Sequence, residues 1–484
     1  MTKLVHLGRL NPRVTVSALP DDVLLEVFGF CVDVHEEYDH DRHHQDRWLT
    51  LVHVCRRWRC VVFASPRSLD LRLFCTPDRP VEKTLDIWPE LPIAIHSFGG
   101  EPQLPGVDNI MAALKKQNRV CKIRITCISN SLLKKFAAMS TPFPVLTDLE
   151  LWSFDENPPI LPDSFLGGSA PLLRDLYLSG VPFPALPKLL LSATNLVCLR
   201  LCHLPHSGYM SPDAIVTGLS ALTRLESLSL QFQSPRSQTN PQGRLTPPLT
   251  LVVLPALTEI SFLGDSEYLE DTVSRIDTPL LCKVDITFFN QLEFSTSTPS
   301  LRHFISRTEL FRAPHRAHII FSVFHLTVKL FHQNEVTDHR KFQLGIAHDP
   351  LDWGCPFLVQ MYISSFPAFP TLEHLRISED RHSRLPWDIY EGSAPQWLNL
   401  FHLFTSVKDL ELSRGFVGFV MFALGGLVGQ QVTEVLPALQ TIFVDGLQLP
   451  DSSNMDPVLL QFVAARHRFG RTVGLHFQGR ENLW

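Results

Sequence analysis

Most of the chain repeats one short apolar pattern, in which a leucine-like residue is followed three and five residues later by two more. The clearest copies occupy Leu146/Leu149/Leu151, Leu173/Leu176/Leu178, Leu196/Leu199/Leu201 and Leu225/Leu228/Leu230. The last two positions of a copy are separated by one residue, so both side chains point to the same face of an extended strand. The pattern therefore predicts a β-strand with one buried face at every copy.

Further copies follow at similar intervals along the chain. They are Leu257/Ile260/Phe262, Leu281/Val284/Ile286, Leu372/Leu375/Ile377, Val407/Leu410/Leu412 and Leu439/Ile442/Val444, with weaker copies at Val120/Ile123/Ile125 and Val323/Leu326/Val328. Consecutive early copies are about 23 to 32 residues apart, and helix-like runs such as Pro187–Thr194 and Asp213–Leu222 lie between them. A strand and a helix at this period predict an α/β solenoid of parallel strands over residues 85–480.

Three features modify this solenoid. The pattern is weakest over residues 287–371, where the register of the strands is open. The run SPRSQTNPQGRLTPP at 234–248 is rich in proline and polar residues and predicts an exposed insertion. Near the end, Pro457–Arg468 predicts a helix and Thr472–Phe477 a strand, so residues 456–480 are expected to cap the array.

The first 75 residues have a different, helical pattern. Leu19-Pro20-Asp21-Asp22 is typical of a helix start, because proline is tolerated in the first turn and acidic residues favour the positive end of the helix dipole. Apolar residues then recur at helical spacing up to Cys31. After a polar interval at 33–46, two more short apolar stretches begin near Trp48 and Val61. We expect two or three short helices over residues 15–75.

The order of motifs in this segment resembles the F-box. The chain supplies LPDDVLLEVF at 19–28, LVHVCRRWR at 51–59 and SPRSL at 65–69, and only the polar interval is longer than is usual in the family. The resemblance implies a module that docks a Skp-type adaptor. Its docking residues here would be Leu19, Pro20, Val23, Leu24, Val27, Val54 and Trp58. The alternative is that these residues pack on the following domain of the chain itself.

The repeats resemble the irregular leucine-rich repeats that follow an F-box, although no asparagine stands at the turn after each strand. In the first clear copies, the positions between the inward leucines carry acidic and aromatic residues. We predict that these positions bind a basic or mixed protein segment: Asp148, Glu150, Trp152, Asp175, Tyr177 and Arg200. The alternative is an ordinary solvated face of a sheet.

Composition and motifs exclude several functions. The net charge of -6 argues against a nucleic-acid or anionic-membrane binder. The apolar run at 415–433 is too short and glycine-rich for a membrane span and predicts a buried helix instead. Ten scattered cysteines and the absence of a secretory signal favour a cytoplasmic or nuclear protein.

Catalytic and metal motifs are also missing. The chain has no phosphate-binding glycine loop, no nucleophile elbow and no H-E-x-x-H sequence. Cys198, Cys202, His203 and His206 form a metal-like cluster, but its cysteines flank one expected strand and would lie too far apart for a single zinc ion. His35, His40, His43 and His44 are more typical of a solvated charged loop. We therefore expect no enzyme, no cofactor and no metal.

The sequence thus predicts a substrate-recognition subunit of a cullin–RING ubiquitin ligase. Its F-box would bind the adaptor and its repeats an unidentified target protein. The alternative is a leucine-rich-repeat scaffold that joins no ligase.

Overall fold

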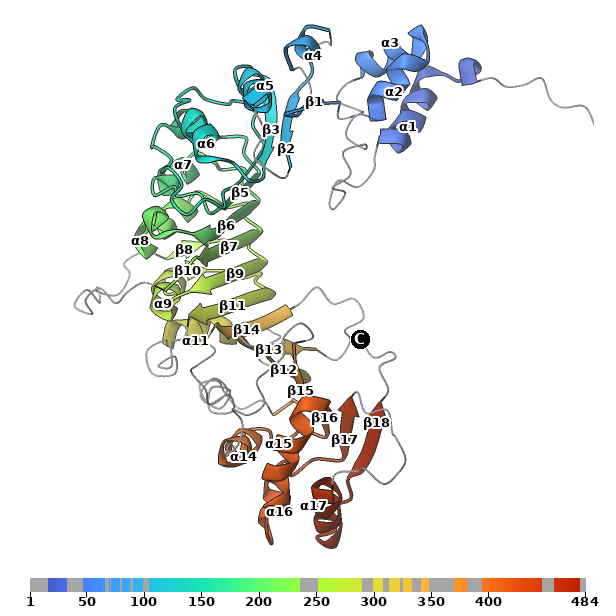
Figure 1. Cartoon of the computed structure of the whole chain (residues 1–484), viewed down its shortest axis with the longest axis vertical. Helices are drawn as coiled ribbons and strands as arrows, with labels where there is room; N and C mark the ends of the chain where they lie inside the picture. Colours follow the sequence, from blue (N-terminus) through green and yellow to red (C-terminus); the bar gives the residue numbers. More distant parts are fainter. Residues whose placement is uncertain are drawn as a thin grey trace, which may run out of the picture. The chain divides into compact units, whose positions relative to one another are not determined.

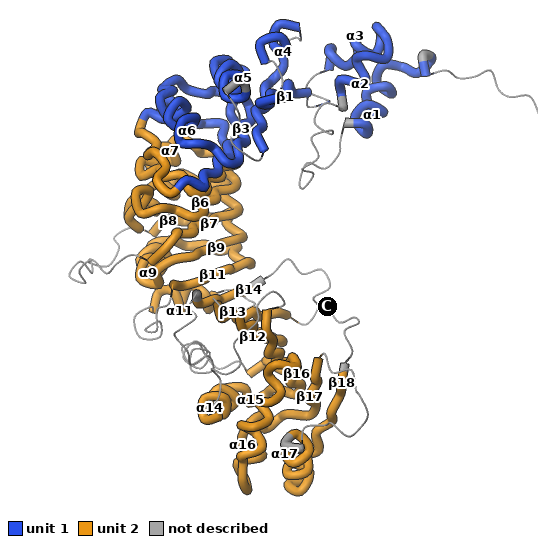
Figure 2. Tube along the Cα trace, in the orientation of Figure 1, with its two compact units in different colours: residues 1–155, 164–173 blue, residues 156–163, 174–484 orange. Residues whose placement is uncertain are grey.

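The computed structural model describes residues 16–32, 47–65, 69, 71–78, 81–87, 90–98, 104–235, 251–289, 299–307, 313–322, 325–332, 341–347, 370–380, 394–445 and 457–478 (Figure 1). The chain divides into two compact units (Figure 2): unit 1 comprises residues 1–155 and 164–173, and unit 2 comprises residues 156–163 and 174–484. The predicted interval at 33–46 and nearly all of the insertion at 234–248 lie outside the described residues.

Unit 1 begins with the predicted helices. A short 3-10 turn at Val16–Ala18 precedes α1 (Asp21–Val32), α2 (Arg47–Val54) and α3 (Arg56–Ala64). Asp21 and Asp22 occupy the first turn of α1 directly after Pro20, as the sequence pattern predicts. At the break between α2 and α3, Cys55 caps α3, and its sulfur accepts a hydrogen bond from the Trp58 backbone N–H at 3.4 Å.

The rest of unit 1 is a parallel sheet covered by helices. Its strands are β1 (Leu73–Cys75), β2 (Ile93–Ser97), β3 (Val120–Ile125) and β4 (Asp148–Trp152), paired in that order. Its helices are α4 (Val81–Ile87), α5 (Leu104–Leu114) and α6 (Asn130–Ala137), followed by the 3-10 segment η2 (Phe165–Gly168). Because β1 pairs with β2 from Leu73 onward, the sheet begins inside the range of 15–75 that we predicted for the helical module.

Unit 2 continues the same alternation of strand and helix. Its first parallel strands are β5 (Asp175–Ser179), β6 (Cys198–Leu204), β7 (Ser227–Phe232), β9 (Glu259–Gly264) and β11 (Lys283–Phe289). Between them lie α7 (Leu186–Leu190), the 3-10 turn η3 (His206–Gly208), α8 (Pro212–Leu219), α9 (Ser266–Val273) and the two-stranded pair β8 (Val252–Val253) and β10 (Ile276–Asp277). Figure 1 shows α8 and α9 together beside this part of the sheet.

The predicted apolar pattern sets the register of these strands. Leu199 pairs with Leu176 on one side and with Leu228 on the other, and all three side chains are buried. The next strands continue the row with Ile260 and Val284. Strands predicted at the strong copies are confirmed, and the α/β class with a mostly parallel sheet is confirmed with them.

The strand order in the region with the weakest pattern, residues 287–371, differs from the prediction. After α11 (Pro299–Ser306) come the strands β12 (Arg316–Phe321), β13 (His325–Phe331) and β14 (Lys341–Ala347). They are ordered β11-β14-β13-β12 in the sheet, and β13 is antiparallel to both neighbours. The weak copy that ends at Leu326 and Val328 was expected to be parallel, and this prediction is wrong. The link from Phe321 to His325 is far shorter than the crossover of about a dozen residues that parallel strands require.

The C-terminal part of unit 2 returns to parallel pairing. It holds β15 (His374–Glu379), α14 (Ala394–His402), β16 (Asp409–Ser413), α15 (Arg414–Gly425), α16 (Gln431–Glu434), β17 (Thr441–Asp445), α17 (Pro457–Arg468) and β18 (Gly474–Gln478). Both elements predicted for the C-terminal cap are confirmed, the helix with the predicted bounds and the strand shifted by two residues at its start.

The first part of the apolar run at 415–433 forms a buried helix, α15, as predicted, whereas residues 426–430 lie outside the helices and Val428 is 76% exposed. In α15, Phe416, Val420 and Leu424 are buried, and the Phe416 ring lies 6.0 Å from that of Trp397 in α14. Across the described part of the chain, every helix is either too short or too polar to cross a membrane.

One buried cation holds this end together. Arg466 of α17 has no exposed surface, and its guanidinium donates hydrogen bonds to the backbone carbonyls of Val432 and Val435 at 3.1 Å and of Leu436 at 3.2 Å. Leu436 has a positive φ of 48°, a strained conformation for this residue. The guanidinium thus satisfies three carbonyls at the point where the chain turns sharply from α16 toward β17.

We predict that Arg466→Met lowers the free energy of unfolding by about 3 kcal/mol, because buried carbonyls lose their donors. Urea unfolding of the purified chain measures this loss. Arg468→Met, at an exposed position of the same helix, should change stability by less than about 0.5 kcal/mol. Equal stability of the two variants would contradict the role of Arg466.

Candidate functional site

The most conspicuous surface of the helical segment is an apolar row on α1. Val23, Val27 and Phe30 follow one another at helical spacing and are 40%, 43% and 82% exposed. A neighbouring side of the helix is formed by Leu24 and Phe28, which are fully buried. Helix α1 is therefore apolar on two sides, of which only one is covered within the chain.

The N-terminal end of this row is fixed by α3. Arg57 donates hydrogen bonds from Nε and Nη2 to Asp21 Oδ1 at 3.0 and 2.6 Å, and Nη2 also reaches the Leu19 carbonyl. The Trp58 ring packs against Phe28 with 4.7 Å between ring centroids. These contacts hold the start of α1 against α3, so the exposed row sits on a packed three-helix surface.

The predicted docking residues separate into two groups. Pro20, Val23, Val27 and Val54 are exposed, and Leu19 and Trp58 are half-buried. Leu24 is fully buried, so we correct its assignment: it belongs to the core of the three helices and cannot present its side chain to a partner. The remaining assignments stay predictions.

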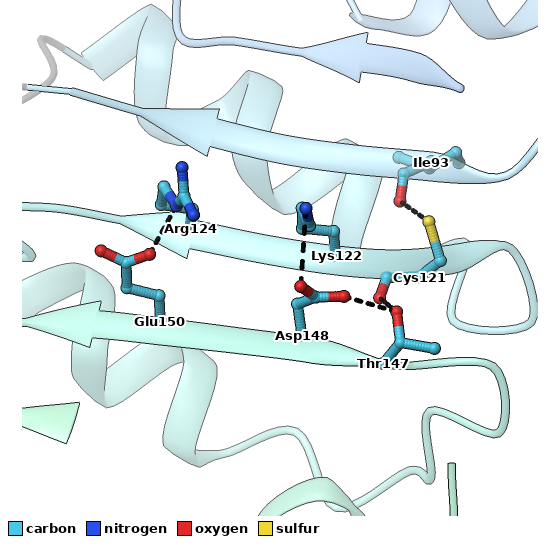
Figure 3. Close-up of polar contacts among 7 residues, drawn as sticks. All are labelled: Ile93, Cys121, Lys122, Arg124, Thr147, Asp148 and Glu150. Carbon is cyan, nitrogen blue, oxygen red and sulfur yellow. Dashed lines mark hydrogen bonds and ion pairs between the residues drawn. The ribbon is translucent and has the colours of Figure 1, made fainter. Parts of the chain in front are cut away.

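The sheet of unit 1 carries the second candidate surface, a ladder of opposite charges between β3 and β4 (Figure 3). Arg124 Nε lies 2.5 Å from Glu150 Oε2, and Lys122 Nζ lies 3.5 Å from Asp148 Oδ1. Parallel pairing aligns each acid with its base, because Lys122 is opposite Asp148 and Arg124 is opposite Glu150. We call these four residues the charge ladder.

Neighbouring polar groups fix one end of the ladder. Thr147 Oγ1 lies 2.6 Å from Asp148 Oδ2 and 3.0 Å from the Cys121 carbonyl, and the Cys121 thiol approaches the Ile93 carbonyl at 3.4 Å (Figure 3). The surface expected here was acidic. It is instead locally neutral, because Lys122 and Arg124 pair with Asp148 and Glu150, which the sequence alone presents as unpaired acids.

Burial next to the ladder keeps a histidine neutral. His96 of β2 pairs in register with Arg124 and is 6% exposed. Burial, together with the nearby charges of Arg124 and Lys122, lowers the pKa of His96 from its ordinary value of 6.5 to about 3. Between Phe74 and Phe98, its ring behaves as an aromatic packing group in the physiological pH range.

The other predicted partner-binding residues lie at comparable strand positions. Trp152 ends β4 and is half-buried, with its ring 6.5 Å from that of Phe154, which is 70% exposed. In unit 2, Tyr177 of β5 pairs in register with Arg200 of β6, while Asp175 at the start of β5 is exposed. Their role in protein binding stays a prediction.

The cysteine and histidine cluster in unit 2 has no nucleophilic character. Cys198 and Cys202 both lie in β6 and are buried, and burial raises the pKa of each thiol. His203 contacts Ser179 at 3.2 Å, whereas His206 contacts Ser234 at 3.0 Å. The two cysteines are thus buried in one strand, and the two histidines contact different serines.

Sequence reasoning missed Phe30 and the basic half of the charge ladder. Phe30 lies three residues after Val27, so the same helical spacing that identified Val23 and Val27 also identifies it. Lys122 and Arg124 occupy, in the weak copy at 120–125, the positions that Asp148 and Glu150 occupy in the next copy. Alignment of the two copies would have found both pairs.

Comparison with known proteins adds no relative. No known family model matches the chain, and no curated protein is similar to it at a significant level.

We predict that Arg124→Glu lowers the free energy of unfolding by about 1 kcal/mol, because it sets two carboxylates opposite each other on adjacent strands. Combining it with Glu150→Arg should restore most of the loss. Urea unfolding in low salt and in 1 M salt provides the measurement, since salt screens such pairs. Strictly additive effects of the two substitutions would show that the pair does not interact.

We predict that the stability of unit 1 falls as the pH is lowered below about 6.5. The folded pKa of His96 is about 3 against an ordinary value of 6.5, so the unfolded chain binds one more proton between these values. Stability is therefore present above pH 6.5 and decreases by at most about 1.4 kcal/mol per pH unit below it. His96→Phe should flatten this slope by one proton in urea unfolding between pH 4 and 7. A stability profile of His96→Phe that runs parallel to that of the wild type would refute the assignment.

Proposed function

We propose that this protein is an F-box-type substrate receptor of a cullin–RING ubiquitin ligase. The N-terminal helices would bind a Skp-type adaptor, and the outer positions of the parallel strands would bind a target protein. The support is the order of the F-box-like motifs on α1, α2 and α3, followed by the leucine-patterned α/β array.

The observation that carries the proposal is the uncovered apolar row Val23–Val27–Phe30 on α1. Three large apolar side chains that are exposed at helical spacing, beside a buried face, are typical of a helix that packs on a partner. Pro20 lies one turn before Val23 and extends the same row. Val54 is also exposed, at 58%, and ends α2 next to the cap of α3.

The mechanism is binding without catalysis. A receptor that holds a ligase at one end and a target at the other raises the effective concentration of the target near the transferring enzyme. No side chain of this chain needs to take part in the chemistry of ubiquitin transfer. The charge ladder and the exposed Phe154 are the features of unit 1 that we would test for target binding.

A second candidate function is a protein-interaction scaffold in which the helices cap the sheet. One contact favours it: the Trp48 indole of α2 is buried and donates a hydrogen bond to the Arg72 carbonyl, directly before β1, at 3.1 Å. The helices are thus attached to the start of the sheet. A capping role, however, does not explain why the apolar row on α1 is exposed.

We predict that the full chain co-purifies with a co-expressed Skp-type adaptor in a stoichiometric complex and that Val27→Glu abolishes this complex. A carboxylate in the centre of the apolar row would be desolvated on docking, at a cost of at least 2 kcal/mol. Pull-down through the adaptor, followed by size-exclusion chromatography, measures the complex. Circular dichroism of the free variants tests their folding.

The matched control is Gly29→Glu. Gly29 lies on the same helix, outside the row, and a side chain added there meets no atom within 4 Å. This variant adds the same charge and, since glycine disfavours helix, should stabilise α1 by roughly 0.5 kcal/mol. It should bind the adaptor as the wild type does. A folded wild type without adaptor binding would favour the scaffold.

A further inference from the structure

Three potential metal ligands meet in unit 2 where the antiparallel strands rejoin the parallel array. His315 directly precedes β12, Glu373 directly precedes β15, and His374 is the first residue of β15. One ligand atom from each of the three side chains lies within 4.8 Å of the other two. The two imidazole rings are 4.9 Å apart at an angle of 64°, and all three residues are half-buried.

The backbone brings these side chains together and fixes them. The carbonyl of His315 accepts hydrogen bonds from the backbone N–H groups of Glu373, at 2.9 Å, and His374, at 3.2 Å. The Thr371 hydroxyl donates to the Pro314 carbonyl at 2.8 Å, one residue before. The three ligands are 58 and 59 residues apart in the sequence, yet their positions are set by one shared carbonyl.

A neighbouring carboxylate sets the tautomer of His374. Its Nδ1 lies 2.8 Å from Asp409 Oδ2 on the adjacent strand β16, and a carboxylate oxygen accepts, so Nδ1 carries the hydrogen. Nε2 is then left with its lone pair. Histidines that bind metals almost always have such a carboxylate or carbonyl partner on the other ring nitrogen.

A cationic side chain also contacts one of the three ligands. Lys408 Nζ contacts Glu373 Oε1 at 2.6 Å, so the ion would compete with this ammonium group for Glu373.

We propose that His315, Glu373 and His374 form a binding site for a divalent transition-metal ion, preferably zinc. Two imidazoles and one carboxylate are a common set of zinc ligands, and the fourth position would be open to water. In a tetrahedral site the ligand atoms are about 3.3 Å apart, so rotation of the side chains must close the remaining distance. The ion would tie the start of β12 to the start of its parallel neighbour β15. This proposal is independent of the proposed ubiquitin-ligase function.

The test is zinc titration of the full chain after removal of metals with a chelator, by calorimetry, with cobalt absorption as a second readout. We expect one zinc equivalent to bind the wild type and raise its melting temperature. His315→Ala and His374→Ala should each weaken binding at least 100-fold, and Asp409→Asn about tenfold. Lys408→Met should strengthen binding, because it removes the competing ammonium.

Two controls separate this site from other histidines. His402→Ala, at an exposed position of α14, should retain the zinc equivalent. A variant with alanine at His35, His40, His43 and His44 should retain it as well, which excludes the histidine-rich interval at 33–46. The proposal is overturned if the wild type binds no zinc, if His315→Ala and His374→Ala bind it as the wild type does, or if only the variant of residues 35–44 loses it. Equal melting temperatures of the metal-free proteins verify that each variant is folded.

Discussion

The register of the parallel strands, which stacks an aliphatic side chain of each strand on that of the next, is the constraint on which the rest of the structure depends. Leu199 pairs with Leu176 and Leu228, and Leu228 pairs in turn with Ile260, so that all four side chains are buried. A single strand cannot bury these residues alone, because its apolar side chains are covered only when the adjacent strands are present. The helices between the strands then close over the row from one side.

The same register also sets the outer positions. When the leucines of adjacent strands align, the residues between them align as well, and opposite charges face each other along the sheet. Lys283 meets Glu259 at 3.0 Å, and Arg376 meets Glu411 at 3.3 Å, just as Arg124 meets Glu150. A largely exposed pair such as Lys283–Glu259 contributes little to stability. Together the pairs remove like-charge repulsion from an outer face on which strands lie only about 4.8 Å apart.

This alignment explains how the three candidate sites differ. The charge ladder and the group of His315, Glu373 and His374 follow from strand pairing, which brings residues of different strands together. The apolar row on α1 follows from one helix alone and has no counterpart within the described residues of unit 1. A face that the chain leaves uncovered is the one for which a partner is most needed.

The sequence was sufficient to predict the strands whose apolar pattern is regular. It predicted β5, β6 and β7 from their leucines, and it predicted α17 from its own apolar pattern. It missed β2, because Ile93–Ser97 is buried throughout and shows no alternation. It also missed the reversal at β13, because an alternating strand has the same pattern in either direction.

The candidate sites were only partly predictable, for related reasons. Helical spacing placed Val23 and Leu24 on one broad stripe, and only the packing of α2 and α3 determines that Leu24 is buried while Val23 is not. Asp148 and Glu150 were identified without Lys122 and Arg124, because a single strand does not specify its neighbour. The group around His374 could not be predicted. His315 lies beside His374 only because β12 pairs with β15, and the sequence did not predict this pairing.

The most direct test is hydrogen–deuterium exchange of the full chain, followed by mass spectrometry, with and without a Skp-type adaptor. We expect the adaptor to slow exchange in peptides covering residues 19–31 and 54–60, and to leave the strands from β3 to β7 unchanged. Unchanged exchange at residues 19–31, in a chain whose strands are protected as in a folded protein, would contradict the docking role of α1.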